Sequence, residues 1–281
     1  MTDTATAMPA DLRAAVARSS FYAGMRILPK AEREAMFAIY GFCRIVDDIA
    51  DDQQAPRAQR GEMLDRWRAW IGALYTGGDA GEAAFLAEAV RGFDLQQADF
   101  LAVIAGMQMD VDADIRWPDF ATLDLYCDRV ASAVGRLSVN IFGMERQVGV
   151  DLAHHLGRAL QFTNILRDID EDAEIERCYL PFEALRQAAI CPQSPRQVAA
   201  ETGIDTAARW LAEKAQEHFL QAGAILATRP RGHLVAPRLM EAAYSRLLVQ
   251  MLTQGWRLPR VRVRVSKWQL ALTALRLAIW R

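Results

Sequence analysis

The sequence predicts an all-α protein with a single domain. Strong helix formers (Ala, Leu, Arg, Glu and Gln) fill long stretches, whereas the Val, Ile and Thr alternation that is typical of strands is nearly absent. No repeat and no long linker divides the 281 residues, which are enough to bury a sizeable core. We therefore expect one bundle of helices packed around a central space.

Loop-forming residues separate the predicted helices in chain order. Leu28-Pro29 precedes the first helix, a Gly-rich turn precedes the third, Trp117-Pro118 precedes the fifth, and Gly143 follows the fifth. The alternation of Val and Arg at 261–265 is too short and isolated to define a sheet. The predicted helices span residues 30–51, 57–75, 80–91, 96–112, 119–142, 151–173, 205–228 and 235–255.

Composition and charge exclude several classes of protein. With 52% apolar and 24% charged residues the chain is of ordinary globular type, and its net charge of −2 argues against a dedicated nucleic-acid-binding protein. The four cysteines show no CxxC spacing and are expected to be reduced thiols. The first 20 residues lack the apolar core of a signal peptide, and no run is long enough to span a bilayer. We therefore expect a soluble, cytoplasmic protein.

The segment 40–52 carries a first candidate metal-binding motif. Asp47 and Asp51 are four residues apart and lie on one helix face, which Arg44 and Tyr40 continue toward the N-terminus. Two stacked carboxylates repel each other and need a cation, and ligands that are all oxygen suit Mg²⁺, completed by phosphate oxygens. The alternative is a solvated acidic helix end, although the C-terminus of a helix disfavours negative charge.

A second motif follows at 161–172. Its oxygen-bearing side chains have the spacing i, i+3, i+7 and i+11, which places them in one stripe between apolar residues: Gln161, Asn164, Asp168 and Asp172. Burying such a stripe is costly unless it holds ions or ligands. Arg167 adds a permanent cation suited to a diphosphate. One stripe alone is explicable as a surface face, but two on separate apolar helices predict two metal-binding walls for a diphosphate leaving group.

These motifs resemble the squalene/phytoene synthase family, from about Ser19 to about Trp256. Residues 126–135 (YCDRVASAVG) resemble one family signature, and residues 156–168 (LGRALQFTNILRD), continuing to Pro181, resemble a second. Glu176 departs from the pattern, because the family often has glycine there. The resemblance implies an isoprenoid-synthase helical bundle with a central apolar cavity, formed by one domain over residues 1–281.

The resemblance also implies roles for individual residues. The metal ligands, with Asp48 beside them, are expected to be Asp47, Asp51, Asn164, Asp168 and Asp172. The diphosphate-binding residues are expected to be Arg44, Arg167 and Arg177, with the N-terminal residues Arg18, Ser19 and Ser20. The prenyl chains are expected to contact Phe21, Tyr40, Gln161, Tyr179 and Tyr244, with Tyr126 near the carbocation. The expected catalytic set is Arg44, Asp47, Asp51, Tyr126, Arg167, Asp168 and Asp172. Without the resemblance, we would interpret Phe21, Tyr40 and Tyr244 as core residues, because they lie among apolar residues in the sequence, and Arg18 as a surface charge.

The implied reaction is the head-to-head joining of two prenyl diphosphates. Mg²⁺ and arginines neutralise a departing diphosphate, so the allylic C–O bond of the donor ionises while apolar helices exclude water. The double bond of the second prenyl chain attacks the cation, and loss of a proton closes a cyclopropane. Tyr126 and the released diphosphate are both candidate proton acceptors.

Within the family, residues 19–40 most resemble the bacterial presqualene diphosphate synthases of hopanoid pathways. In that subfamily two farnesyl diphosphates give presqualene diphosphate, and a separate downstream enzyme forms squalene. Phytoene, dehydrosqualene and squalene synthases share every motif quoted, so they stay as alternatives. A non-catalytic assembly factor of the same family is the alternative of a different class, although such a relative need not keep both aspartate motifs.

Two further features bear on partners. The C-terminal tail, 256–281, carries seven basic residues and no acidic one, with Trp256, Trp268 and Trp280 interleaved. Basic residues beside Trp and Leu suit a helix that lies on an anionic membrane, on its cytoplasmic face; the alternative is a terminal helix that packs on the bundle. The four histidines, including the His154-His155 pair, lack a ligand-like arrangement in the sequence and are expected to be structural or exposed.

Overall fold

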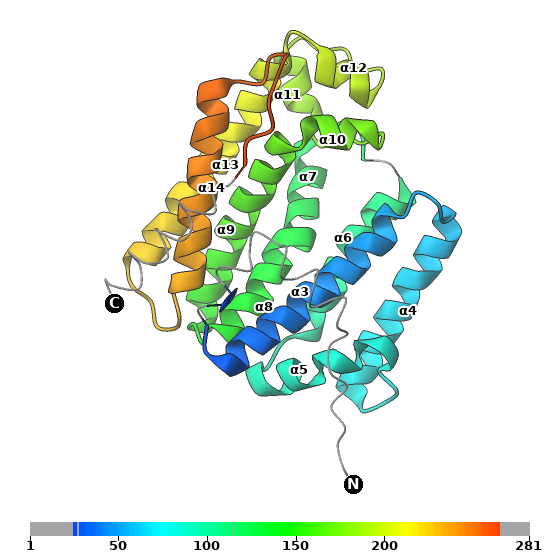
Figure 1. The fold of residues 1–281 in the computed structure, drawn as a ribbon, viewed down its shortest axis with the longest axis vertical. Helices are drawn as coiled ribbons and strands as arrows, with labels where there is room; N and C mark the ends of the chain where they lie inside the picture. The colour runs from blue at the N-terminus through cyan, green and yellow to red at the C-terminus, as the bar shows by residue number, and fades with distance from the viewer. Residues whose placement is uncertain (1–24, 27, 114, 265–281) are drawn as a thin grey trace.

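The computed structural model describes residues 25–26, 28–113 and 115–264 (Figure 1). Within these residues the elements are helices, and the one β-type pairing is an isolated bridge between Arg116 and Cys178. The predicted all-α fold is confirmed. The elements are α3 Lys30–Asp51, α4 Arg57–Thr76, η1 Gly81–Leu86, α5 Ala87–Phe93, α6 Gln97–Asp112, α7 Phe120–Cys127, η2 Asp128–Ser132, α8 Ala133–Ile141, α9 Arg146–Arg167, α10 Ile169–Glu174, α11 Phe182–Gln187, α12 Pro195–Ala200, α13 Ile204–Ala227 and α14 Val235–Gln254.

Helix α9 lies at the centre of the bundle. It packs against α13 and α14 on one side and against α8 and η2 on the other, and Figure 1 shows the long helices side by side. Helix α3 packs across α6 and α8, while α4 covers α6 at the edge of the molecule (Figure 1). One contiguous core of buried apolar side chains joins these helices. Their mutual burial supplies the main driving force for this arrangement.

Two predicted helices are divided into shorter elements. The predicted helix 80–91 is η1 followed by α5, and the predicted helix 119–142 is α7, the π-helical turn η2 and α8. The switch to π-helical hydrogen bonding occurs where α9 comes closest: a Cβ on Gly157 would lie 2.7 Å from backbone atoms of Ser132. Local apolar periodicity does not reveal such a turn, because it is set by packing against another helix.

The helix that carries the second motif also differs from its prediction. It begins at Arg146 and ends before Asp168, whose φ of −105° and ψ of 20° depart from helical values, and α10 follows. The short helices α11 and α12 lie in segments predicted to be loops. Helix α12 carries a recognisable start signal: the Ser194 hydroxyl accepts a hydrogen bond from the Gln197 N–H, and Pro195 occupies the first turn.

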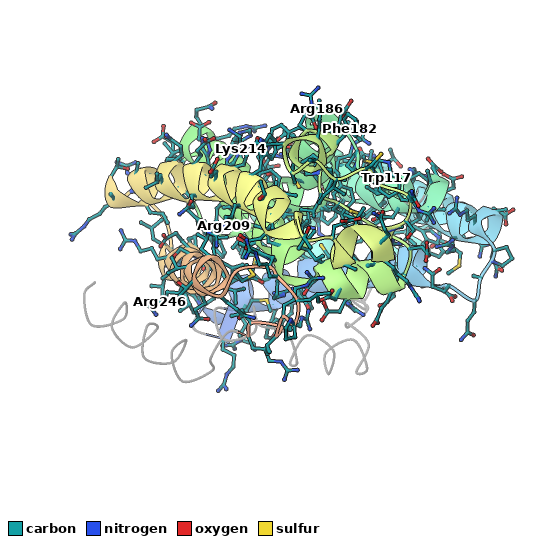
Figure 2. All side chains as sticks on the ribbon, turned by 90° about the horizontal axis from the view of Figure 1, so that it is seen from above. Trp117, Phe182, Arg186, Arg209, Lys214 and Arg246 are labelled. Atoms are coloured by element: carbon teal, nitrogen blue, oxygen red, sulfur yellow. The ribbon has the colours of Figure 1, made fainter. Side chains whose placement is uncertain are left out.

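Arg209 fixes the end of α14 and the segment after it against α13. Its guanidinium donates hydrogen bonds to the Asp205 carboxylate (2.8 Å) and to the Leu252 carbonyl (3.1 Å), and lies 6.0 Å from the ring centroid of Trp256. Figure 2 looks down on the bundle and shows Arg209 between the yellow helix α13 and the orange helix α14. The chain beyond α14 is thereby directed across the end of α9.

Candidate active site

An apolar cavity of about 290 Å³ lies between α3, η2, α8, α9 and α14. Its wall is almost entirely hydrocarbon, with Gly135 and Gly157 leaving room where α8 and α9 approach. The polar side chains on its lining include Tyr40, Gln161 and Asn164. Tyr40 stands about one turn before Arg44 on α3, and Asn164 about one turn before Asp168, so one end of the cavity opens toward both predicted motifs.

The first motif occupies the last turn of α3, as predicted. Arg44 donates a hydrogen bond to Asp47 (3.1 Å) and forms an ion pair with the exposed Asp48 (2.6 Å). The carboxylate of Asp51 instead pairs with Arg177 (2.6 Å). The motif therefore already has a partial counter-charge from two of the arginines that were expected to bind diphosphate.

The second motif spans the break between α9 and α10. The apolar side chains beside it are buried as predicted: Phe162, Ile165, Leu166 and Ile169. The break at Asp168 turns the carboxylate toward two arginines, so that Oδ1 accepts from Arg167 (2.8 Å) and from Arg262 (3.0 Å). The predicted stripe is therefore not one straight helical row, because Asp172 belongs to α10.

Arg177 and Asp110 join the two motifs. Arg177 follows the second motif in sequence yet pairs with Asp51 of the first, and its Nε lies 4.0 Å from the buried carboxylate of Asp110. Asp110 accepts hydrogen bonds from the hydroxyls of Tyr126 (3.0 Å) and Tyr179 (2.8 Å), whose rings stack with centroids 5.1 Å apart. This buried network places a carboxylate and two phenols between the two walls.

Asp110 is the main residue that sequence reasoning missed. It lies near the end of α6 in MQMDVDADI, an apolar segment with aspartates at every second position. Such an acidic group inside an apolar helix is the signal that could have identified it, because buried carboxylates are rare unless they are paired. Burial raises the pKa of Asp110 above its ordinary value, while Arg177 and the two tyrosine hydroxyls act in the opposite direction.

The same electrostatic pattern occurs in both walls. Burial raises the pKa of Asp47 to about 7, and the neighbouring Asp51 contributes to the increase. Burial likewise raises the pKa of Asp172 to about 8, with Asp168 contributing. Although burial also opposes ionisation of Asp168, hydrogen bonds from its two arginines hold its pKa below the ordinary value. Each wall thus combines one carboxylate that resists ionisation with one that an arginine already binds.

The donor set of these walls fits a hard divalent cation. Carboxylate and amide oxygens are the ligands that Mg²⁺ and Ca²⁺ take in proteins. Among the described residues, the buried Oδ1 of Asn164 has no hydrogen-bond partner, and a buried amide oxygen without a partner is costly. The raised pKa values of Asp47 and Asp172 also fit a cation site, since a bound cation would stabilise the ionised form of both carboxylates.

Other predicted residues fall in four groups. Tyr40 and Gln161 line the cavity, whereas Tyr126 and Tyr179 are buried on Asp110 rather than on the cavity lining. Tyr244 is buried and hydrogen-bonds Arg167, which connects it to the second motif. The N-terminal set Arg18, Ser19, Ser20 and Phe21 lies outside the described residues.

The described part of the tail packs on the body. Trp256 is buried and donates its indole N–H to the carbonyl of Leu166 (2.7 Å). Arg260 pairs with Asp170, and Arg262 reaches Glu171 (3.0 Å) as well as Asp168. Arg260 and Arg262 therefore bind acidic groups of the bundle. Trp268, Trp280 and the rest of 265–281 lie outside the described residues.

Comparison with known proteins places this geometry in a family. The model of the squalene/phytoene synthase family matches residues 14–269. A presqualene diphosphate synthase of Zymomonas mobilis is 58% identical over 93% of this chain and 89% of its own, and one of Rhodopseudomonas palustris is 52% identical over 95% of each. A crystal structure of a dehydrosqualene synthase has the same fold, with a TM-score of 0.78 at 23% identity over 96% of this chain and 95% of its own. The chain belongs to the squalene/phytoene synthase family.

Proposed function

We propose that this chain joins two farnesyl diphosphates head to head to give presqualene diphosphate. The observation that carries the proposal is an apolar cavity whose polar lining residues include Tyr40 and Asn164, which belong to the two motif segments. An apolar wall suits prenyl chains, and the motifs suit diphosphates. The product is inferred from the relatives of Zymomonas mobilis and Rhodopseudomonas palustris, whose names are presqualene diphosphate synthase.

We expect the leaving diphosphate to be bound between the two walls. The metal, which we propose to be Mg²⁺, would supply positive charge to the diphosphate oxygens, with ligands from Asp47, Asp51, Asn164, Asp168 and Asp172. Arg44, Arg167 and Arg177 each already contact a motif carboxylate. A movement of these guanidiniums from carboxylate to phosphate oxygens would add charge-assisted hydrogen bonds to the leaving group, while the metal takes their place on the carboxylates.

The cavity supplies the remaining conditions for the reaction. Its hydrocarbon lining excludes water from the allylic cation that forms when the C–O bond ionises. The double bond of the second chain then attacks the cation, and loss of a proton closes the cyclopropane. Tyr126, whose hydroxyl donates to Asp110, is one candidate acceptor: it would take this proton while passing its own to the Asp110 carboxylate. The released diphosphate is the other candidate.

One incubation series tests the proposed function. The purified chain is supplied with farnesyl or geranylgeranyl diphosphate, with and without NADPH, and the products are identified by mass spectrometry. We expect a C30 diphosphate ester from farnesyl diphosphate that NADPH does not convert. Squalene formed with NADPH, dehydrosqualene from the C15 substrate, or phytoene from a preferred C20 substrate would assign the chain to a different activity of the family. No Mg²⁺-dependent release of diphosphate from either substrate would indicate the non-catalytic assembly factor.

We further propose that residues 265–281 bring the enzyme to the anionic face of a membrane, where a product with a long hydrocarbon part must pass to a squalene-forming enzyme. No helix in the described part of the chain is long and apolar enough to cross a bilayer. Since Trp256, Arg260 and Arg262 pack on the bundle, a truncation should end after Arg264. We expect the full chain, but not this truncation, to sediment with phosphatidylserine vesicles; equal sedimentation of both would contradict the membrane role.

A further inference from the structure

Two consecutive histidines of α9 meet a third, distant in sequence, on the face of α9 that packs against α13. His154 and His155 are consecutive on α9, and His218 comes from α13. The Nδ1 atoms of His155 and His218 lie 3.0 Å apart, and the three residues each offer a ligand atom within 4.8 Å of the other two. The expectation that the histidines lack a ligand-like arrangement is therefore wrong, because it considered only the sequence neighbours His154 and His155.

We infer that His154, His155 and His218 bind one first-row transition-metal ion of the zinc class. Imidazole nitrogen is a preferred ligand of Zn²⁺, Cu²⁺, Ni²⁺ and Co²⁺, whereas Mg²⁺ prefers oxygen. Nitrogens on a tetrahedral Zn²⁺ lie about 3.4 Å apart, given Zn–N bonds of about 2.0–2.1 Å. The pair at 3.0 Å already has nearly this separation, and the ligand atoms of all three residues lie within 4.8 Å of one another. A water molecule is expected as the fourth ligand.

This site is separate from the aspartate motifs. The residues of α9 that line the apolar cavity include Gly157, Gln161 and Asn164. His155 belongs to a different face of the helix, since its ring and that of Phe162 both contact His218 from α13. A bound ion would therefore link α9 and α13 from outside the cavity, without contact with the diphosphate site.

The charges around the cluster permit a cation. The nearest permanent positive charge is Arg158, which donates hydrogen bonds to the carboxylates of Asp124 (2.7 and 2.9 Å) and Asp128 (3.2 Å). These two acids partly offset its charge, and Asp124 opposes the effect of Arg158 on the pKa of His154 and His218. Burial lowers the pKa of His218 to about 4, with His155 and Arg158 contributing.

The plainer interpretation is a hydrogen bond between two neutral imidazoles. That bond needs only His155 and His218, and it accounts for the 3.0 Å distance. It does not account for the third imidazole, whose ring centroid lies 4.8 Å from that of His155 and 5.7 Å from that of His218. The two interpretations predict different behaviour toward added metal, which makes them separable by experiment.

The test uses the full chain freed of metal by EDTA and dialysis, then supplied with one equivalent of Cu²⁺ or Zn²⁺ in excess Mg²⁺. Electron paramagnetic resonance of Cu²⁺ distinguishes nitrogen from carboxylate ligands, so binding at the aspartate motifs is not mistaken for binding here. We expect nitrogen superhyperfine structure in the wild type and its loss in His155→Ala/His218→Ala. Zn²⁺ affinity, measured against a chromogenic chelator, is expected to fall at least about tenfold in each of the single variants His155→Ala and His218→Ala.

His233→Asn is the matched control, because His233 pairs with Glu32 outside the cluster (2.6 Å) and its loss should leave Cu²⁺ binding unchanged. Mg²⁺-dependent diphosphate release should be retained in His218→Ala. If His218→Ala does not fold, His218→Gln keeps a side chain of similar size and carries the same test. Oxygen-only ligation in the wild type, or an unchanged nitrogen signal in the double variant, would overturn the inference and leave the imidazole hydrogen bond.

Discussion

Asp172 offers a direct test of whether the second wall is built to hold a cation. Its pKa is raised from 3.8 to about 8, chiefly by burial. One pKa unit corresponds to about 1.4 kcal/mol, so at pH 7 the raised pKa lowers the free energy of unfolding of the metal-free protein by about 4 kcal/mol. Solvent screening of this partly exposed group reduces the loss to about 2 kcal/mol. Asp172→Asn removes this loss and keeps the size of the side chain.

The sign of the pH dependence is fixed by linkage. Because the folded-state pKa of Asp172 lies above the unfolded value, the folded protein holds the extra proton, and its free energy of unfolding falls as pH rises from about 4 to about 8. The variant lacks this decline. In EDTA, Asp172→Asn should therefore exceed the wild type by a margin that widens from pH 5 to pH 8, reaching about 4 °C in Tm at about 2 kcal/mol.

Thermal unfolding at pH 5, 7 and 8, in EDTA and in Mg²⁺, is the assay. Mg²⁺ should raise the Tm of the wild type, since a ligand that binds only the folded state stabilises it, and should raise that of Asp172→Asn much less. Glu174→Gln, an exposed acid on the same short helix, controls for the loss of one negative charge. Equal Tm values for Asp172→Asn and wild type at pH 8 in EDTA, or a margin that does not change with pH, would refute the reasoning.

Substitutions at four other positions separate the roles of charge, strain and packing. Asp47→Ala and Asp168→Ala should both abolish diphosphate release with a retained circular dichroism spectrum. In EDTA, however, Asp47→Ala should raise the Tm, because burial disfavours the charge of Asp47. Asp168→Ala should lower the free energy of unfolding by about 1 kcal/mol, because two arginines lose their acceptor. A change in stability of the same sign in both variants would contradict this. Glu176 has φ of +63°, so Glu176→Gly should be about 1 kcal/mol more stable than Glu176→Ala in urea unfolding; equal midpoints would argue against backbone strain. Gly157→Ala should cost about 1–3 kcal/mol, because its Cβ would meet η2 at 2.7 Å, whereas Gly92→Ala meets nothing and should be neutral or better.

The backbone conformation at Glu176 bears on the departure from the family pattern at this position. Its left-handed backbone is the conformation that glycine adopts without strain, which is a physical reason for glycine at this position in relatives. Here the side chain is instead held by Arg116, which donates to the Glu176 carbonyl (3.0 Å) and carboxylate (3.2 Å). The sequence shows that this residue is Glu, but only the structure shows that it adopts a left-handed backbone conformation.

Features that depend on near neighbours were predictable from the sequence. The all-α class, the start of α3 after Pro29 and the position of the first motif in its last turn follow from composition, a helix-starting proline and i, i+4 spacing. The burial of Phe162 and Leu166 beside the second motif followed from the same periodicity. These properties involve residues within one or two helical turns, whose relative positions the helical backbone fixes.

Contacts between distant residues were decided only by the tertiary structure. Arg177 is 126 residues from Asp51, and Asp110 lies on a third helix between them in the chain. Neither contact of Arg177 can therefore be recognised from a pattern of near neighbours in the sequence. The break at Asp168, the joining of His218 to the histidines of α9, and the seating of the tail arginines on α10 are of the same kind. Each depends on which helix faces packed together, a choice made by burial of the whole apolar core rather than by the residues that finally meet.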